Sequence, residues 1–367
     1  MDNFQFLVNY YKNLPALIKV VWIASSVFFA VFIVLVGYLK YLRFTLRKRE
    51  ANAKPLESYF EQQLITYLYA GNDLDEVSSE QQKIIDDLKI YAEKEFNRKI
   101  LIETLLKLKN EVSGEVAELI QQLYYKTGLL NYALKKIKNK NWYVIAKGIR
   151  ELTQFHITEP QKIIEGHLSH KQREVRKEAQ LYFVNLFHFK GLEFLSELKS
   201  DLTEWDQIQL LEILQKFPEQ EIPTLDVWLK STNNSVVLFA LKLAKMYNQY
   251  NTKERLLELL NHKNEQVKIQ TIKVISHLQI FEAKEILKNT FALRSVDEQI
   301  AFVKMLEDMF ELADEAFLKK QALHPNFEIK FTALKILKIL NIETFKSIEE
   351  SSVETEHNRV VKFVANN

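Results

Sequence analysis

The chain has 367 residues, with 50 Lys and Arg against 48 Asp and Glu, and it contains no cysteine. The absence of cysteine excludes disulfide bonds, thiol catalysis and cysteine-ligated zinc or iron–sulfur sites. Only seven glycines and six prolines interrupt a sequence rich in Leu, Ile, Lys, Glu and Gln. This composition favours long α-helices with short turns, so we expect an all-α protein. The many Lys, Asn and Ile residues are typical of an AT-rich genome, which suggests a bacterial source.

The first informative segment is Val20–Leu39, a run of twenty residues without an ionisable side chain. A helix rises about 1.5 Å per residue, so this run matches the roughly 30 Å hydrocarbon core of a bilayer. A cleaved signal peptide would have a shorter apolar region of about 7–15 residues and a small-residue cleavage site. We therefore expect an uncleaved, single transmembrane helix over residues 20–42.

The charges beside this run predict its orientation. Residues 1–50 carry seven basic and two acidic residues, a balance of +5, which leaves −3 for residues 51–367 of a chain with net charge +2. Five of the seven basic residues follow the apolar run, and cytoplasmic flanks are enriched in Lys and Arg. We expect residues 1–19 to form a short extracytoplasmic or interfacial segment and residues 43–56 a basic juxtamembrane connector. The remainder would lie in the cytoplasm, beside the inner (cytoplasmic) membrane.

Residues 57–109 show helical periodicity without a clear repeat. The pattern predicts helices at Glu57–Tyr69, Ser79–Phe96 and Arg98–Leu108. Gly71-Asn72-Asp73 would end the first of these, and Ser78 or Ser79 can cap the second. We expect this segment to be an atypical N-terminal cap of the repeats that follow.

A repeat of roughly 31 residues follows. Each copy has a short polar turn, a β-branched residue after it and a small residue four positions later, as in Val175 with Ala179 and Val267 with Thr271. The β-branched residues recur at intervals of 28 to 33 positions: Val112, Val144, Val175, Ile208, Val236, Val267, Ile300 and Ile329. A helix-period pattern follows each turn and an antiparallel helix precedes it, for example Thr252–Leu260 and Ala283–Phe291. Helix pairs at a fixed period predict an α-solenoid.

The turn followed by Val175-Arg176-x-x-Ala179, with Val267-Lys268-x-x-Thr271 and Ile329-Lys330-x-x-Ala333, resembles the short form of the HEAT repeat. The resemblance covers roughly residues 110–345. It implies a right-handed α-α superhelix, which with the cap would span residues 57–345 in about 7–8 helical hairpins. The acid typical of the turn is mostly replaced by His, Lys or Asn, so the sequence does not predict a regular Asp–Arg ladder between repeats.

Beyond residue 345 the pattern fades into an acidic stretch, Glu349–Glu356. We expect residues 346–367 to be a flexible tail. The last apolar residues, Val360–Val364, could dock as a strand or short helix, but a frayed terminus is the expectation.

The sequence holds no P-loop, dinucleotide-binding glycine motif or nucleophile elbow. His167 and His170 have a spacing that could hold a metal, but His170, His262 and His324 share one repeat position, and a role in turn structure explains all three. We therefore expect no metal, no cofactor and no catalytic residue. A DNA-binding HEAT-like glycosylase would need a basic domain, and the balance of −3 argues against a nucleic-acid partner.

The surface with the strongest binding potential is basic. In HEAT-like folds the second helix of each pair lines the concave side, and the outward basic residues there could receive an acidic helix, an acidic tail or an anionic head group. These candidate partner-binding residues are Arg150, Arg176, Lys177, Lys242, Lys245, Lys268, Lys273, Lys335 and Lys338. The alternative is that the same charges only solvate their helices and pair with neighbouring Glu or Asp.

These observations favour a membrane-anchored, non-catalytic scaffold or adaptor. It would bind a protein partner, presumed to be membrane-associated, at the cytoplasmic face of the membrane, with Val20–Leu39 in the bilayer. The setting could be a membrane enzyme, export or signalling complex. Two alternatives are a membrane-tethered HEAT-like enzyme, either a lyase or a hydrolase, and a sensor of an anionic small ligand.

Overall fold

The computed structural model describes residues 15–70, 77–217, 219–351 and 356–366. Every regular element within these ranges is a helix. The chain divides into two compact units, Met1–Lys135 with Gln154–His156, and Lys136–Thr153 with Ile157–Asn367. Residues 1–14, which make up most of the expected extracytoplasmic or interfacial segment, lie outside the described residues.

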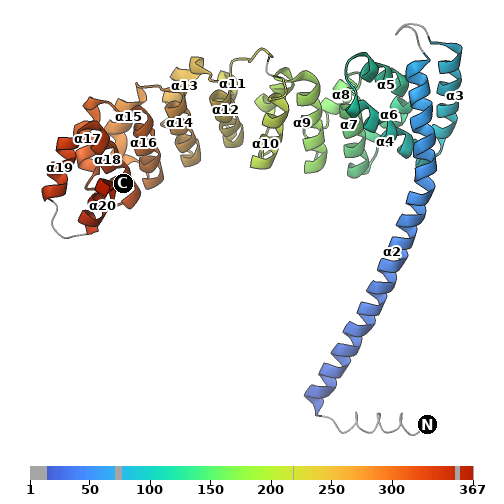
Figure 1. Cartoon of the computed structure of the whole chain (residues 1–367), viewed down its shortest axis with the longest axis horizontal. Coiled ribbons are helices and arrows are strands. Elements are labelled where there is room, and N and C mark those ends of the chain that lie inside the picture. Colours follow the sequence, from blue (N-terminus) through green and yellow to red (C-terminus); the bar gives the residue numbers. More distant parts are fainter. Residues whose placement is uncertain (1–14, 71–76, 218, 352–355, 367) are drawn as a thin grey trace. The chain divides into compact units, whose positions relative to one another are not determined.

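The described part of unit 1 opens with one continuous helix, α2 (Ala16–Tyr69), which contains the apolar run, the basic connector and the first cap helix (Figure 1). The segments expected at 20–42, 43–56 and 57–69 are therefore joined without a break, even though Pro55 lies inside the helix. The helix is long and apolar enough to cross a membrane, and its most apolar window is not buried against protein. Further along, Phe60 and Leu64 are fully buried.

The second half of α2 packs against α3 (Ser79–Glu93) and α4 (Glu95–Glu111). Ser78 caps α3 in a reciprocal capping box with Gln81, which confirms the cap expected at this position. The Tyr59 hydroxyl donates to the Asp87 carboxylate at 2.6 Å, and this bond raises the pKa of Tyr59 to about 12. Helices α5 (Glu115–Lys126) and α6 (Leu129–Ile137) follow.

Unit 2 alternates short first helices with longer second helices. The second helices are α7 (Trp142–Gln154), α9 (Arg173–Phe187), α10 (Glu204–Leu214), α12 (Asn234–Met246), α14 (Glu265–Leu278), α16 (Val296–Met309) and α18 (Phe327–Leu340). The elements between them are α8 (Gln161–Glu165), η1 (Lys190–Glu197), α11 (Asp226–Leu229), η2 (Tyr250–Thr252), α13 (Lys253–Leu259), α15 (Ala283–Thr290), η3 (Phe291–Leu293), η4 (Leu312–Asp314) and α17 (Glu315–Gln321). The first helices expected near 252–260 and 283–291 are confirmed as α13 and α15.

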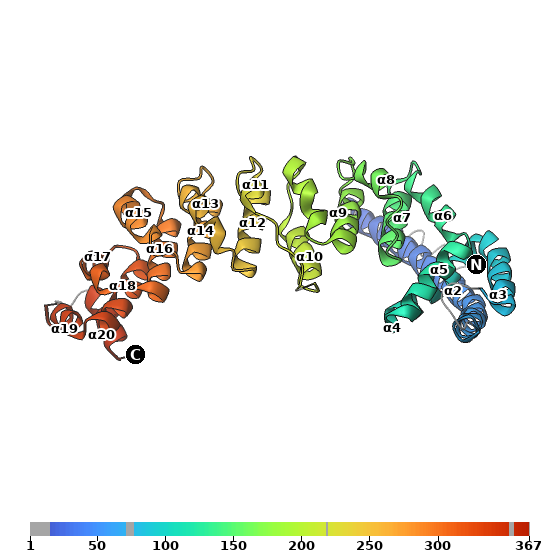
Figure 2. The same ribbon diagram turned by 90° about the horizontal axis from the view of Figure 1, so that it is seen from above.

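Successive hairpins of unit 2 stack side by side. Helix α11 packs on α12, α13 on α14 and α17 on α18, while α12, α14, α16 and α18 pack against one another in succession (Figures 1 and 2). One continuous apolar core runs through these layers. The small residues of the repeat, such as Ala179, Ala240, Thr271 and Ala333, are fully buried, which lets neighbouring helices approach closely.

The structural period is more regular than the sequence pattern suggested. The residues that precede the first turn of six successive second helices are Gln172, Thr203, Asn233, Asn264, Ser295 and Asn326, at intervals of 31, 30, 31, 31 and 31. Except at Gln172, their side chains accept hydrogen bonds from the free amides of the helix start.

Two of the β-branched residues assigned to the repeat are out of register. The third residue is buried in every second helix from α9 onward, and in α9, α12, α14 and α18 it is the expected Val175, Val236, Val267 or Ile329. In α7 the expected Val144 holds this position and is half-buried. In α10 and α16 this position holds Asp206 and Glu298, whereas Ile208 is 45% exposed. The assignments of Ile208 and Ile300 were therefore two residues late, because an apolar pattern cannot register a buried acid. Val112, the first of the series, follows the end of α4 instead of opening a helix.

The expectation of a flexible C-terminal tail is corrected for the described part. Residues 342–351 form α19 (Ile342–Ser351) and residues 356–366 form α20 (Glu356–Asn366), both packed on α18. Val361 is fully buried and Val364 nearly so, and the Lys338 ammonium donates to the Val364 and Ala365 carbonyls at 2.9 and 3.0 Å. The apolar end therefore closes the last layer as a helix.

Candidate functional site

The nine basic residues singled out in the sequence all lie on second helices of unit 2. Arg150 is on α7, Arg176 and Lys177 are on α9, Lys242 and Lys245 on α12, Lys268 and Lys273 on α14, and Lys335 and Lys338 on α18. They do not form one free basic stripe, because most of them contact a carboxylate or a carbonyl.

Six of the nine have such a contact. Arg150 pairs with Glu178 on α9, Lys268 with Glu298, Lys335 with Glu307 at 2.5 Å and Lys242 with Glu204 at 3.8 Å. Arg176 donates to two turn carbonyls, those of His170 and Lys171, and Lys338 donates to the end of α20. The alternative, in which these basic residues pair with neighbouring Glu or Asp or otherwise stay within the fold, therefore describes most of the nine. Among the described residues, Lys177, Lys245 and Lys273 have no ion pair.

Buried carboxylates explain this pairing, and the apolar sequence pattern does not predict them. Each buried acid faces a cation: Glu151 faces Lys136, Glu178 faces Arg150, Asp206 faces Arg173, Glu298 faces Arg294 and Lys268, and Asp314 faces Lys284 and Lys288. A signal was present at two of these positions. Thr203-x-x-Asp206 and Ser295-x-x-Glu298 are capping-box patterns that mark the start of a helix.

Asp314 shows the electrostatics of such a site. Its side chain is fully buried, and burial alone would raise its pKa. Hydrogen bonds from the Lys284 and Lys288 ammonium groups outweigh burial, so the pKa of Asp314 lies below its usual range. Each of these paired acids except Glu151, whose partner Lys136 lies on the first helix of the same hairpin, links adjacent hairpins. None of them is poised as a free general acid or base.

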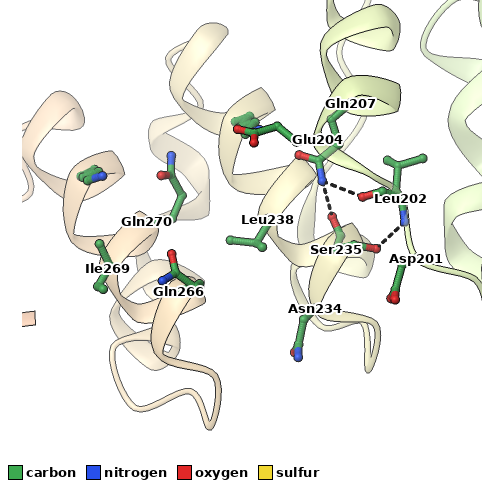
Figure 3. Close-up of a pocket in the computed structure, with 12 residues that line it drawn as sticks. Asp201, Leu202, Glu204, Gln207, Asn234, Ser235, Leu238, Gln266, Ile269 and Gln270 are labelled. Atoms are coloured by element: carbon green, nitrogen blue, oxygen red, sulfur yellow. Dashed lines mark hydrogen bonds and ion pairs between the residues drawn. The ribbon is translucent and has the colours of Figure 1, made fainter. Parts of the chain in front are cut away.

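A groove opens on the second-helix face where α10, α12 and α14 run side by side, with a volume of about 440 Å³ (Figure 3). We call it the α12–α14 groove. Its lining residues are Asp201, Leu202, Glu204, Gln207, Asn234, Ser235, Leu238, Lys242, Gln266, Ile269, Gln270 and Lys273. It brings together two of the predicted basic residues, Lys242 and Lys273, and adds polar amides that the sequence reasoning had not identified.

Hydrogen bonds fix the α10 side of this groove. The Gln207 amide nitrogen donates to the Leu202 carbonyl at 3.1 Å and to the Ser235 carbonyl at 3.5 Å. The Ser235 hydroxyl accepts from the Leu202 amide at 2.9 Å. Across the groove, Gln266, Ile269 and Gln270 project from α14 (Figure 3). The α10 side is therefore preformed, while the amides and Lys273 on α14 border open space.

A second, larger cleft of about 1090 Å³ lies over α8, α9 and η1. Phe183, Phe187 and Phe194 line it together with charged residues of both signs, such as Lys190 and Glu193. Gly191 shapes this cleft, because a side chain there would lie 2.2 Å from the Phe183 carbonyl oxygen. The close approach is specific to glycine.

The histidines have the turn role that the sequence suggested. The Nδ1 atoms of His170, His262 and His324 each accept the backbone N–H two residues later, at 3.1, 3.0 and 3.1 Å. His167 contacts the Ile137 carbonyl at 3.0 Å. Within the described ranges, no group of three or more His, Asp or Glu side chains could hold a metal ion. The three tryptophans of unit 2 lie on separate helices, Trp142 on α7, Trp205 on α10 and Trp228 on α11, and of these only Trp228 is buried.

Comparisons with known proteins assign no family. No family model matches the chain, and no curated protein matches it in sequence. Among solved structures, an engineered protein aligns over 84% of this chain and 98% of its own, at 15% identity and a TM-score of 0.34. A second engineered protein covers 71% and 96% at 14% identity and a TM-score of 0.21. A structure described as showing tubulin recruitment by microtubule polymerases with TOG domain arrays covers 86% and 96%, at 12% identity and a TM-score of 0.25.

Proposed function

We propose that this protein is a membrane-anchored, non-catalytic scaffold. In this proposal α2 crosses the inner (cytoplasmic) membrane once, with the N-terminus outside. The stacked hairpins form a right-handed HEAT-like solenoid in the cytoplasm, where they bind a protein partner within a membrane enzyme, export or signalling complex. The observation that carries the proposal is the single helix that joins an exposed apolar span to packed helices.

The exposure of the first half of α2 supports membrane insertion. Phe28, Phe29 and Val34 are 75%, 67% and 69% exposed, and their neighbours along the run are similar. Water-soluble proteins rarely expose a contiguous apolar surface of this extent. In a bilayer the same surface is matched to lipid, and the helix satisfies its own backbone hydrogen bonds. Trp22 at one end and Tyr38 and Tyr41 at the other suit the two membrane interfaces.

Continuity of the helix would set how far the packed helices stand from the lipid. Residues 43–56 lie between the expected span and the first buried residues of α2, and as a helix they extend about 20 Å. This segment carries Arg43, Arg47, Lys48 and Arg49, which favour an anionic cytoplasmic surface. A helical spacer would hold the packed helices of unit 1 at a defined height and keep the chain near the membrane, where a membrane-bound partner is concentrated.

The chemistry of unit 2 supports binding as its activity. Its buried acids are engaged by cations on adjacent elements, so their charge maintains the stacking. The free polar groups lie instead on the second-helix face, at the α12–α14 groove. Stacked helical repeats bind partners along such extended faces.

Membrane topology can be tested directly because the chain has no cysteine. Single cysteines at Asn3 and at Thr232 would be probed in intact cells with a membrane-impermeant maleimide. The proposal predicts labelling of the Asn3→Cys variant in intact cells, and labelling of the Thr232→Cys variant only after lysis. Labelling of both or of neither in intact cells, or recovery of the chain in the soluble fraction, would refute a single-pass anchor with this orientation.

Partner binding needs a separate experiment. The full chain would be purified from membranes in a mild detergent, and proteins that co-purify reproducibly would be identified by mass spectrometry. A variant with Lys242, Lys245 and Lys273 changed to Glu should lose the partner, whereas the Lys177→Glu control should retain it. Failure to recover any reproducible partner would contradict the scaffold function.

A further inference from the structure

We propose that the α12–α14 groove binds an extended, acidic peptide segment of the protein partner. This inference rests on the proposed scaffold function and specifies the chemistry of what the scaffold recognises. It comes from the arrangement of free amides, one unsatisfied buried acceptor and free ammonium groups along three neighbouring helices.

Free amide side chains are the first part of the arrangement. Asn234 lies at the start of α12, and Gln266 and Gln270 lie one turn apart on the same face of α14. Among the described residues these three side chains make no hydrogen bond, although other amides nearby, such as Gln207 and Asn233, are engaged. A side-chain amide offers both donors and an acceptor, which is the pattern that a peptide unit also presents.

Gln207 adds an unsatisfied group to the floor of the groove. Its side chain is only 4% exposed, and its nitrogen is used in bonds to the Leu202 and Ser235 carbonyls. Its Oε1 atom has no donor among the described residues. A buried acceptor without a donor is unfavourable, so a ligand N–H that reached it would be stabilised. A peptide backbone supplies such donors at every residue except proline.

Basic and acidic side chains lie at different sides of the groove. Lys242 and Lys273 line it on the α12 and α14 sides, and Lys245 lies one turn further along α12. Lys273 and Lys245 have no ion pair within the described residues, and Lys242 has only the 3.8 Å contact with Glu204, whose side chain is 82% exposed. Asp201 and Glu204 lie at the α10 side. Carboxylates of a ligand would therefore be favoured over the lysines and disfavoured over α10.

The dimensions fit a short extended chain. Packed helices lie about 8–10 Å apart, so a path from α10 across α12 to α14 covers about 16–20 Å. Extended peptide advances about 3.3–3.6 Å per residue, so five or six residues would cross all three helices. Leu238 and Ile269, both partly buried, offer an apolar contact between the polar groups. A small anion could reach the lysines, but it would leave the amides unused.

The test uses the full chain held in lipid nanodiscs, with a displayed library of random nine-residue peptides as the probe. Peptides enriched in Asp and Glu should be recovered, and one of them, fluorescently labelled, should bind with an affinity that falls as salt rises. Lys242→Ala with Lys273→Ala should weaken its binding about tenfold, and Gln266→Leu with Gln270→Leu by a similar factor. Lys177→Ala, a lysine outside the groove, should change the affinity less than twofold.

Backbone recognition has its own control. Methylation of alternate peptide nitrogens removes N–H donors and should weaken the enriched peptide at least tenfold. Equal binding of the methylated and unmethylated peptides would overturn recognition of the peptide backbone. Displacement of the bound peptide by ATP or inorganic phosphate at micromolar concentration would overturn it as well. Enrichment of basic or apolar peptides, no enrichment, or no effect of the lysine changes would also overturn it.

These outcomes are distinguishable from failure of the scaffold function. If a partner co-purifies from membranes regardless of Lys242 and Lys273, the scaffold stands and the groove inference is wrong. If no partner co-purifies, the scaffold function itself is wrong.

Discussion

In the 31-residue register, Glu298 occupies the position that Val236 and Val267 fill in the hairpins before it. We predict that replacing Glu298 with valine nevertheless destabilises the fold. Glu298 is 1% exposed and accepts a 3.1 Å contact from Arg294, whose side chain is 5% exposed, as well as a contact from Lys268. The Glu298→Val variant leaves the Arg294 guanidinium buried without a counter-charge. Breaking one side of a buried pair costs about 3–5 kcal/mol. At about 2–4 °C per kcal/mol, the Tm should fall by about 10 °C.

The assay is thermal unfolding of the full chain in detergent, followed by far-UV circular dichroism, for the single and double variants. Arg294→Leu with Glu298→Val replaces the pair by apolar residues and should recover stability to within about 2 kcal/mol of the parent. Glu328→Gln is the control, because Glu328 pairs with Lys304 at the surface, where the two side chains are 46% and 55% exposed. Loss of this exposed pair should cost less than about 1 kcal/mol. An unchanged Tm for Glu298→Val, or a double variant as unstable as the single one, would refute the reasoning.

Three further predictions follow from individual sites. The two lysines beside Asp314 lower the pKa of its carboxyl group. The carboxylate therefore stabilises the fold above the ordinary aspartate pKa near 4, and this contribution is lost as the pH falls below that value. The Asp314→Asn variant should be less stable at pH 7, and its Tm should fall less steeply in acid than that of the parent. Gly191→Ala should cost more than about 2 kcal/mol by the same assay, because its methyl group would clash with the Phe183 carbonyl; a cost below 1 kcal/mol would contradict the packing. Changing Val31 and Val34 to Arg should cost about 2.5–3.5 kcal/mol each within the proposed membrane span and move the chain out of the membrane fraction, whereas Asn52→Arg should not.

The helical architecture of unit 2 was predictable because valine, isoleucine and a following small residue mark the buried start of most second helices. The positions of Asp206 and Glu298 were not, since a search for apolar periodicity passes over an acid whose burial depends on a cation from another hairpin. The capping-box sequence patterns at their helix starts, Thr203-x-x-Asp206 and Ser295-x-x-Glu298, are a local signal that gives the correct register.

For the basic residues, too, the sequence predicts the helix on which each one lies but not its ionic partner. Sequence spacing placed all nine on second helices, but it could not distinguish Arg150 and Lys268, which neutralise buried acids, from Lys273, which borders the groove without an ion pair. That distinction depends on residues about 30 positions away. The docking of α20 likewise depends on an apolar surface of α18 that is distant in the sequence.

Site-specific photo-crosslinking from Gln270 tests whether the α12–α14 groove binds a protein partner at the membrane. A benzoylphenylalanine at this groove position would be activated in living cells that express the full chain, with the same probe at Lys177 as the control. We expect a discrete protein adduct in the membrane fraction from position 270, which is absent from position 177 and lost when residues 20–39 are deleted. The absence of any adduct from position 270, or an equal adduct from the chain without its span, would contradict a membrane-held binding surface.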